Sequence, residues 1–171
     1  MRTDFLTPVM KFSSMLVNIG IIWIVIGAIL IFGKKTRLIG VMMLTSLAVC
    51  ISINNIFIKH LVARARPFDT YCDLIPLIKK PRDFSFASGH TTASFASVGI
   101  LARFIPKPFA VLAIIYAFLV AYSRLYLGVH YPTDVLCGLI IGTSGSIIVY
   151  NLFSKKYELK NIKTNRNHKK N

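Results

Sequence analysis

Residues 15–32 read MLVNIGIIWIVIGAILIF, an uncharged stretch of 18 residues in which Asn18 is the one polar amide. At 1.5 Å per residue, a helix of this length spans about 27 Å, enough to cross the hydrocarbon core of a bilayer. No small-residue cleavage site follows, and Lys34, Lys35 and Arg37 come directly afterwards, so the stretch is not typical of a cleaved signal peptide. It predicts a transmembrane helix.

Four further apolar runs predict additional crossings: residues 38–58, 91–105, 109–122 and 135–153. In the second of these, Arg103 lies near the end, from where a long side chain can extend to the headgroups. Residues 1–14 place apolar side chains among Arg2 and Lys11, a pattern typical of a helix that lies in the membrane interface. We therefore expect an all-α fold, a polytopic membrane helix bundle of about five transmembrane helices with an N-terminal interfacial helix.

The composition of the whole chain is that of a membrane protein. Of its 171 residues, 54% are apolar and 16% are charged, whereas soluble domains have roughly a quarter charged residues. This length is typical of one domain. We assign residues 1–153 to a membrane-embedded domain, and residues 154–171, with seven basic side chains, to a solvated and disordered tail.

Basic residues outnumber acidic ones by 21 to 6, which gives a formal net charge of +15. In a soluble protein such an excess points to nucleic acid, but in an apolar chain it marks cytoplasmic flanks and anionic ligands, so no nucleic-acid partner is expected. With the tail inside, twelve basic residues lie on the cytoplasmic side and nine outside. The positive-inside rule then favours a multi-pass plasma-membrane protein with a cytoplasmic C-terminus.

The first of three polar clusters is KHLVARARP at residues 59–67. Lys59 and Arg66 are seven residues apart, two helical turns, so both can project from one helix face before Pro67 stops the helix. Two cations on one face suit an anion such as phosphate. A cluster at the membrane edge that binds lipid headgroups is an equally good interpretation of this segment alone.

The second cluster is FSFASGH at residues 84–90, where the 91–105 run begins. Ser88 is a candidate N-cap, Gly89 allows a ligand to approach the backbone, and His90 lies in the first helical turn. Free N–H groups at a helix start bind anions. Ordinary capping, with a polar histidine at the interface, is the alternative.

The third cluster begins with Ser123 and Arg124 and continues, after five residues, with HYPTD. Pro132 suits the first position of a helix, which puts Asp134 in the first turn, within reach of the His130 imidazole. A carboxylate bonded to one ring nitrogen sets the tautomer and leaves the other nitrogen free for nucleophilic attack. The alternative is that the carboxylate only complements the helix dipole.

The order of the crossings brings these clusters to one side of the membrane. One run ends at the first cluster, the next begins at the second, and the last two meet at the third. We therefore expect three cations to gather around one helix N-terminus with two histidines: Lys59, Arg66 and Arg124 with the turn at Ser88–His90 and with His130. This set predicts a phosphate pocket with a nucleophile and an acid.

Taken together, Lys-x6-Arg-Pro at 59–67, Ser-Gly-His at 88–90 and Ser-Arg-x5-His-x3-Asp at 123–134 resemble the signature of the type-2 phosphatidic acid phosphatase family. That family consists of membrane lipid phosphatases and shares its pocket with vanadium haloperoxidases. The resemblance covers residues 15–153 in the arrangement of the spans. The chain departs from the pattern at Ala87, where the family has proline; a proline would preset this turn, but no reacting group is lost.

The resemblance implies a role for each residue. His130 attacks phosphorus and forms a phosphohistidine, Asp134 orients His130, and His90 protonates the leaving oxygen and then activates water. Five residues hold the phosphate oxygens: Lys59, Arg66, Ser88, Gly89 and Arg124. Phosphoryl transfer needs this kind of positioning and charge stabilisation. The family's pocket uses no metal, and we expect neither a metal nor a cofactor.

A pocket built from helix ends lies near the headgroup plane, so the expected substrate is a lipid phosphate or diphosphate in the bilayer. In the favoured orientation the pocket is extracytoplasmic, which fits recycling of a polyprenyl carrier, and the chain resembles bacterial undecaprenyl-diphosphate phosphatases. Phosphatidylglycerol phosphate and phosphatidic acid stay open as substrates. A non-catalytic protein that binds or transports lipids is the alternative from another class.

Two other features have more than one interpretation. The charged loop 68–85 either contributes to selectivity or is a plain solvated loop, and the second is favoured. Gly138, Gly142 and Gly145 offer a close-packing face on the last run, which we assign to packing within the bundle rather than to a structural membrane subunit. The oligomeric state stays open.

Overall fold

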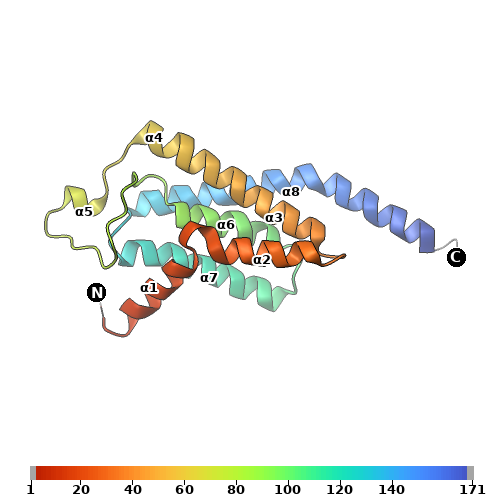
Figure 1. Ribbon diagram of the computed structural model, residues 1–171, viewed down its shortest axis with the longest axis horizontal. Helices are drawn as coiled ribbons and strands as arrows, with labels where there is room; N and C mark the ends of the chain where they lie inside the picture. The colour runs from red at the N-terminus through yellow and green to blue at the C-terminus, as the bar shows by residue number, and fades with distance from the viewer. Residues whose placement is uncertain (1–2, 169–171) are drawn as a thin grey trace.

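A computed structural model describes residues 3–168, with side chains as far as Ser154. Every regular element in these residues is helical, which confirms the predicted all-α class (Figure 1). In chain order the helices are α1 (Leu6–Leu16), η1 (Asn18–Gly20), α2 (Ile21–Phe32), α3 (Arg37–Ser52), η2 (Ile53–Ile58), α4 (Lys59–Val62), α5 (Pro67–Thr70), α6 (Gly89–Leu101), α7 (Lys107–Tyr126) and α8 (Pro132–His168). Of these, η1 is a 3₁₀ helix and η2 a π-helix.

Helix α6 lies at the centre of the bundle (Figure 1). It packs against α3, α7 and α8, and Trp23 of α2 donates its indole N–H to the Ser94 hydroxyl of α6 over 3.2 Å. Many of its buried side chains are small or carry a hydroxyl, among them Thr91, Thr92 and Ala96. Small side chains let neighbouring helices approach closely, so the longer helices pack around α6.

Glycines on α8 make this close packing possible. A Cβ built on Gly138 would lie 2.7 Å from the main-chain oxygen of Ser88, and one on Gly142 would lie 2.6 Å from that of Thr92. A Cβ on Gly145 would collide with a side chain of α3. The predicted role of these glycines in packing within the bundle is confirmed.

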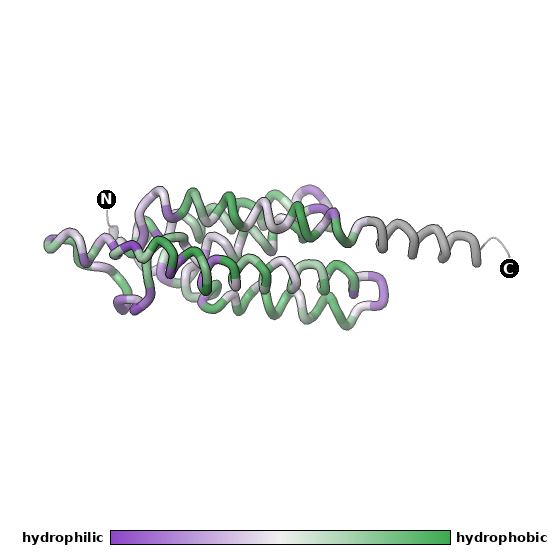
Figure 2. Tube along the Cα trace, turned by 90° about the horizontal axis from the view of Figure 1, so that it is seen from above, coloured by the Kyte–Doolittle hydropathy of each residue, from purple (hydrophilic) through white to green (hydrophobic). Residues whose placement is uncertain are grey.

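The outer surface of the bundle is apolar. Large hydrophobic side chains are exposed on α2, α3, α7 and α8, for example Ile29, Phe32, Val49, Leu112, Ile115, Leu136, Ile140 and Ile148. Figure 2 shows hydrophobic residues along the helices and hydrophilic ones gathered toward the ends. Three helical stretches of the described residues are long and apolar enough to cross a membrane: Arg37–Thr70, Lys107–Tyr126 and Pro132–Ser154. A bilayer is the solvent that such a surface requires.

The predicted first crossing, residues 15–32, is not one continuous helix. Ile19 and Gly20 have left-handed backbone angles, with φ of 54° and 74°, and the chain bends by 45° between α1 and the helices that follow. Glycine adopts such angles without strain, which makes this the place where the chain can turn. The bend lays α1 beside α7, where Tyr116 donates its hydroxyl to the main-chain oxygen of Ser13 over 3.2 Å. If α1 and the bent segment Asn18–Phe32 together count as one span, the described residues have four candidate crossings instead of three.

The predicted crossing at 91–105 is shorter than expected, because α6 ends at Leu101. Its 13 residues span about 20 Å, too little for a bilayer core. Neighbouring helices shield α6 from lipid, so the thickness of the hydrocarbon core does not set the length of this helix. A membrane bundle is confirmed, whereas a count of five crossings is not. Of the tail predicted at 154–171, the structure describes the backbone as far as His168, which continues helix α8, and the side chain of Ser154.

Four helix ends meet at one end of the bundle, opposite the turn between α2 and α3 (Figure 1). Helices α4 and α7 end there, and α6 and α8 begin there. Main-chain hydrogen bonds join these ends: Ser88 N–H donates to the Asp134 oxygen over 3.0 Å, and Ser85 N–H donates to the Arg64 oxygen over 2.9 Å. The three polar clusters therefore lie at the same end of the bundle, as the order of the crossings predicted.

Contrary to the prediction, Lys59 and Arg66 do not lie on one helix. Helix α4 ends before Ala63, whose φ is 45°, and Arg66 follows in an extended conformation. Pro67 begins α5 instead of stopping the preceding helix. The backbone of Arg64 bonds to the loop before α6, and its side chain bonds to the start of α8. These contacts between distant segments replace the helical hydrogen bonds that the chain gives up here.

Candidate active site

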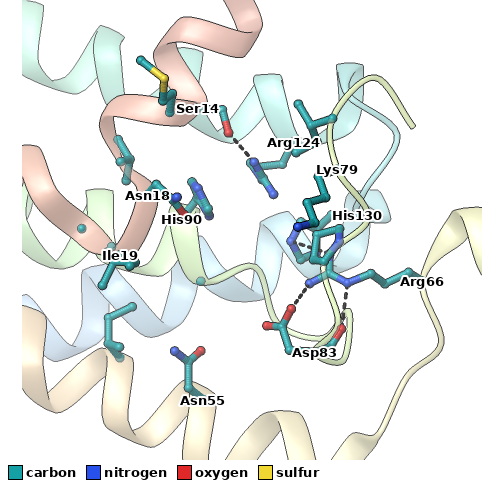
Figure 3. A pocket seen from close by; sticks show the side chains of 18 of the residues that line it. Ser14, Asn18, Ile19, Asn55, Arg66, Lys79, Asp83, His90, Arg124 and His130 are labelled. Atoms are coloured by element: carbon teal, nitrogen blue, oxygen red, sulfur yellow. Dashed lines mark hydrogen bonds and ion pairs between the residues drawn. The ribbon is translucent and has the colours of Figure 1, made fainter. Parts of the chain in front are cut away.

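A cavity of about 570 Å³ opens where the four helix ends meet (Figure 3). Its wall includes six of the residues predicted for the site: Lys59, Arg66, Gly89, His90, Arg124 and His130. The other two, Ser88 and Asp134, are fully buried and adjoin this wall. Residues from four separate chain segments therefore share one cavity.

His130 and Asp134 form the pair predicted from their spacing. The imidazole Nδ1 lies 3.4 Å from Oδ2 of Asp134, and Nε2 lies 3.4 Å from a terminal nitrogen of Arg66. Asp134 is in the first turn of α8, which Pro132 begins. Because the carboxylate faces Nδ1, the nitrogen on the side of the cations is Nε2.

Donors from several segments hold the carboxylate of Asp134. The Ser85 hydroxyl donates to Oδ2 over 2.5 Å, and the Tyr131 N–H donates to the same oxygen over 2.9 Å. Arg64 donates to Oδ1 over 2.9 Å, while its guanidinium carbon lies 3.7 Å from the centre of the Tyr131 ring. A carboxylate held in this way is fixed in orientation, and it fixes the imidazole in turn.

The three predicted cations are buried at the cavity. Arg66 is anchored by a main-chain oxygen 2.7 Å from one terminal nitrogen. Arg124 donates to Ser14 of α1, and its Nε has no hydrogen-bond partner among the described residues. Lys59 forms an ion pair with Asp83. Buried cations with so little counter-charge attract a polyanion such as phosphate.

Helix α6 begins at Gly89, and Ser88 before it has an extended backbone. Ser88 therefore occupies the predicted N-cap position. Its side chain makes no capping bond to the backbone, and its hydroxyl instead accepts a hydrogen bond from the Thr91 hydroxyl over 3.0 Å. His90, in the first turn, lines the cavity together with Gly89. The N-terminus of α6 is therefore at the cavity, where its free N–H groups favour an anion.

Burial lowers the pKa of His130 to about 4, and the charges of Arg124 and Arg66 act in the same direction, against the effect of its carboxylate partner. The imidazole is therefore neutral at physiological pH, as a nucleophile must be. Partial burial acts to raise the pKa of Asp83, but its contacts with Lys59 and Arg66 outweigh burial and lower this pKa to about 2. The Asp83 carboxylate is therefore charged at physiological pH.

Seven further residues belong to the site or hold its residues in place, and none of them was predicted from the sequence. They are Ser14, Asn18, Arg64, Lys79, Lys80, Asp83 and Ser85. Four of them lie in the loop 68–85, whose charged side chains are exposed as predicted but which also forms part of the cavity wall. Ser85 and Arg64 reach Asp134 across 49 and 70 residues of chain, which no local pattern can link. For Lys79, Lys80 and Asp83, the signal in the sequence was the high density of charge in a loop that connects two site clusters.

The cavity offers the chemistry of cations and imidazoles. Within the described part of the chain, no group of three or more His, Cys, Asp or Glu side chains is arranged to hold a metal ion. Figure 3 shows Arg66, Arg124, His90 and His130 around the same space, with Asp83 bonded to Arg66. Such a site can bind an anion and present both a neutral nucleophile and a second histidine to it.

Comparison with known proteins agrees with this arrangement. The PAP2 superfamily matches residues 35–158. The chain is 37% identical over 122 residues to the undecaprenyl-diphosphatase of Sulfolobus acidocaldarius, covering 71% of this chain and 59% of that protein. It is 35% identical over 129 residues to phosphatidylglycerophosphatase B of Bacillus subtilis, covering 70% and 60%. The chain thus spans about three fifths of the length of these two relatives.

Solved structures have the same fold. A PAP2-type phosphatidylglycerolphosphate phosphatase from Bacillus subtilis superposes with a TM-score of 0.75 at 30% identity, covering 91% of this chain and 80% of that one. LpxE from Aquifex aeolicus superposes with a TM-score of 0.72 at 25% identity, covering 88% of each chain. The family match includes all three polar clusters, which confirms the resemblance drawn from them. This chain belongs to the PAP2 superfamily.

Proposed function

We propose that this protein is an integral-membrane lipid phosphatase that hydrolyses a phosphate monoester or diphosphate of a lipid without a metal ion. The observation that carries the proposal is a cavity at the end of a membrane bundle where two imidazoles, three buried cations and a helix N-terminus meet. The names of the relatives, an undecaprenyl-diphosphatase and a phosphatidylglycerophosphatase, support the same class of reaction.

In the first step, the lone pair of His130 Nε2 forms a bond to phosphorus as the bond from phosphorus to the leaving oxygen breaks. His90, which carries a proton in the complex because the bound phosphate anion offsets the neighbouring cations, gives that proton to the leaving oxygen. Lys59, Arg66 and Arg124 stabilise the charge on the remaining phosphate oxygens. The lipid alcohol leaves, or the lipid monophosphate when the substrate is a diphosphate, and a phosphohistidine remains.

In the second step, water attacks the phosphohistidine. Its oxygen forms a bond to phosphorus, the bond from phosphorus to His130 Nε2 breaks, and the water proton passes to His90. Inorganic phosphate leaves, and both histidines return to their starting states. Asp134 keeps the His130 ring in one orientation through both steps, because its carboxylate is held by donors from three segments.

The substrate class we propose is a polyprenyl diphosphate such as undecaprenyl diphosphate. The cavity lies at the helix ends, next to apolar helix surfaces, so a phosphate in it can carry a tail that stays in lipid. The similarity to an undecaprenyl-diphosphatase supports this class. Similarity to Bacillus subtilis phosphatidylglycerophosphate phosphatase, found both by sequence and by structure, favours phosphatidylglycerol phosphate as the second candidate. Phosphatidic acid is a third.

The test is release of inorganic phosphate by the purified full-length chain in detergent with EDTA, across polyprenyl diphosphate, phosphatidylglycerol phosphate and phosphatidic acid. We expect release from at least one lipid, fastest from polyprenyl diphosphate, and a loss of about 10³-fold or more in His130→Ala. His60→Ala is the matched control, because His60 is exposed and outside this cavity, and it keeps full activity.

Two results would contradict the proposal. Full activity of His130→Ala would remove the assigned nucleophile. Lipid binding by the wild-type protein with no phosphate release from any of the three lipids would favour the non-catalytic lipid-binding alternative.

A further inference from the structure

The carboxylate of Asp83 pairs with Lys59 and Arg66, two of the three cations that the proposed function assigns to phosphate binding. Its Oδ2 contacts the Lys59 ammonium, and its Oδ1 lies 2.7 Å from a terminal nitrogen of Arg66. Among the described residues, Asp83 is the one acidic side chain that lines the cavity. Carboxylate and phosphate oxygens are recognised by the same ammonium and guanidinium donors. Asp83 therefore stands where a phosphate oxygen would be expected.

Arg66 has no N–H left for a phosphate while this contact lasts. Of its five N–H groups, two donate to Asp83: Nε to the main-chain oxygen over 2.8 Å and one terminal nitrogen to Oδ1. The others face main-chain oxygens of Val129 and Phe84, at 2.7 and 3.4 Å, and His130 Nε2, at 3.4 Å. A phosphate that binds Arg66 must displace one of these partners.

Of these partners, the Asp83 carboxylate is the one that carries a negative charge, as a phosphate does, and it is exposed to solvent. Its side chain is 53% exposed, whereas those of Lys59 and Arg66 are 7% and 4% exposed. It belongs to a loop between α5 and α6 that is held to the bundle by few main-chain bonds, among them Leu77 N–H to Leu127. An exposed carboxylate regains hydration when it leaves, but the buried cations need a counter-charge, which the incoming phosphate supplies.

We propose that Asp83 is a resident counter-ion of the phosphate site, which the substrate phosphate displaces from Lys59 and Arg66. The inference rests on the proposed function, because it takes the cavity to be the phosphate site. The displaced carboxylate stays close on its loop, so it competes with inorganic phosphate after the reaction and speeds product release. Asp83 thus lowers the affinity of the site for phosphate, whereas the cations raise it.

The test compares binding of orthovanadate, a phosphate analogue, to the wild-type protein and to Asp83→Asn, by calorimetry at constant pH and ionic strength. We expect Asp83→Asn to bind about tenfold more tightly, because two partly exposed ion pairs no longer have to be broken. The matched control is Asp73→Asn, an exposed aspartate of the same loop outside the cavity, which binds as the wild type does. Equal or weaker binding by Asp83→Asn would overturn the inference, because Asp83 would then be inert or would position the cations.

Kinetics give a second readout of the same competition. In Asp83→Asn, inorganic phosphate inhibits hydrolysis at about tenfold lower concentration and the KM for the lipid falls. A residue that only positions Arg66 would instead lower kcat and leave phosphate inhibition unchanged or weaker.

A structure of the wild-type protein with orthovanadate provides a test that does not depend on the variant folding. We expect Oδ1 of Asp83 beyond hydrogen-bonding distance from Arg66, and an intact ion pair beside bound vanadate would overturn the inference. Vanadate binding is measured without turnover, so it decides the role of Asp83 even if the protein hydrolyses no lipid. The absence of lipid hydrolysis would count against the proposed function alone.

Discussion

Asp134 connects the candidate nucleophile to three segments of the chain through one carboxylate. It faces His130 Nδ1, and it accepts hydrogen bonds from Ser85, Arg64 and the Tyr131 N–H. An amide side chain has a similar shape, but it presents an N–H where the carboxylate has an acceptor oxygen. In the proposed mechanism, the carboxylate keeps the proton of the imidazole on Nδ1, so that the lone pair of Nε2 faces the phosphate.

We expect Asp134→Asn to lower kcat by about 10²- to 10⁴-fold while the KM changes little, because the orientation and tautomer of His130 are lost but the cations are not. The measurement is steady-state phosphate release in detergent. Asp69→Asn is the control, because Asp69 is an exposed carboxylate outside the cavity. Activity within a few-fold of wild type in Asp134→Asn would contradict the orienting role.

The ionisation of His130 makes a prediction about pH. Its pKa of about 4 is below the ordinary 6.5 because of burial and the neighbouring cations, so the imidazole stays neutral as the pH falls from 7 to 5. In the unfolded chain the same imidazole takes up a proton near pH 6.5, so His130 destabilises the folded state increasingly as the pH falls from 6.5 to 4. NMR of ¹⁵N-histidine-labelled protein, with His130→Asn to identify the signal, would show no protonation of His130 above about pH 5. A titration midpoint of His130 near pH 6.5 would contradict this prediction.

At the scale of elements, the contact between α6 and α8 holds the second and third polar clusters in register. The Gly142 Cα lies so close to α6 that an added Cβ would be 2.6 Å from the main-chain oxygen of Thr92 and 2.8 Å from the nitrogen of Ala96. Neither contact involves a flexible side chain that can move aside. The helices themselves would have to separate.

We expect Gly142→Ala to lower the unfolding temperature in detergent by about 3–8 °C, because overpacking of a tight helix contact costs roughly 1–3 kcal/mol. Ser144→Ala is the control, on an exposed position of the same helix. An unchanged unfolding temperature in Gly142→Ala, or an equal loss in the control, would mean that this contact does not limit the packing of the two helices.

For the whole molecule, the side of the membrane that the cavity faces is a proposal that one cysteine can test. Cys72 is exposed in the loop at the cavity end, Cys50 is buried, and Cys137 is half-buried on α8. If the cavity is extracytoplasmic, a membrane-impermeant maleimide labels Cys72 in intact cells, and Cys72→Ser abolishes the label. Labelling that requires opened membranes would place the cavity on the cytoplasmic side and the C-terminus outside.

Several features of the bundle were predictable because they depend on near neighbours in the chain. A run of 18 apolar residues and a proline at a helix start act within a few residues of where they occur. The bend at Gly20 was not predictable in this way, since a glycine permits a left-handed turn but does not require one. The short length of helix α6 was not predictable either. This helix is surrounded by protein, so it does not need the roughly 20 apolar residues of a helix that faces lipid.

From its sequence alone, this protein is an apolar helical chain whose few charged residues form three clusters that the order of its crossings brings to one side. Those properties follow from hydropathy, helix geometry and spacing, which act locally. Only the tertiary structure decided that Arg66 reaches the cavity from an extended segment, that Ser85 and Arg64 hold Asp134, and that Asp83 pairs with Lys59 and Arg66. The physical reason is that ion pairs and hydrogen bonds act over a few ångströms, and packing alone determines which distant residues come that close.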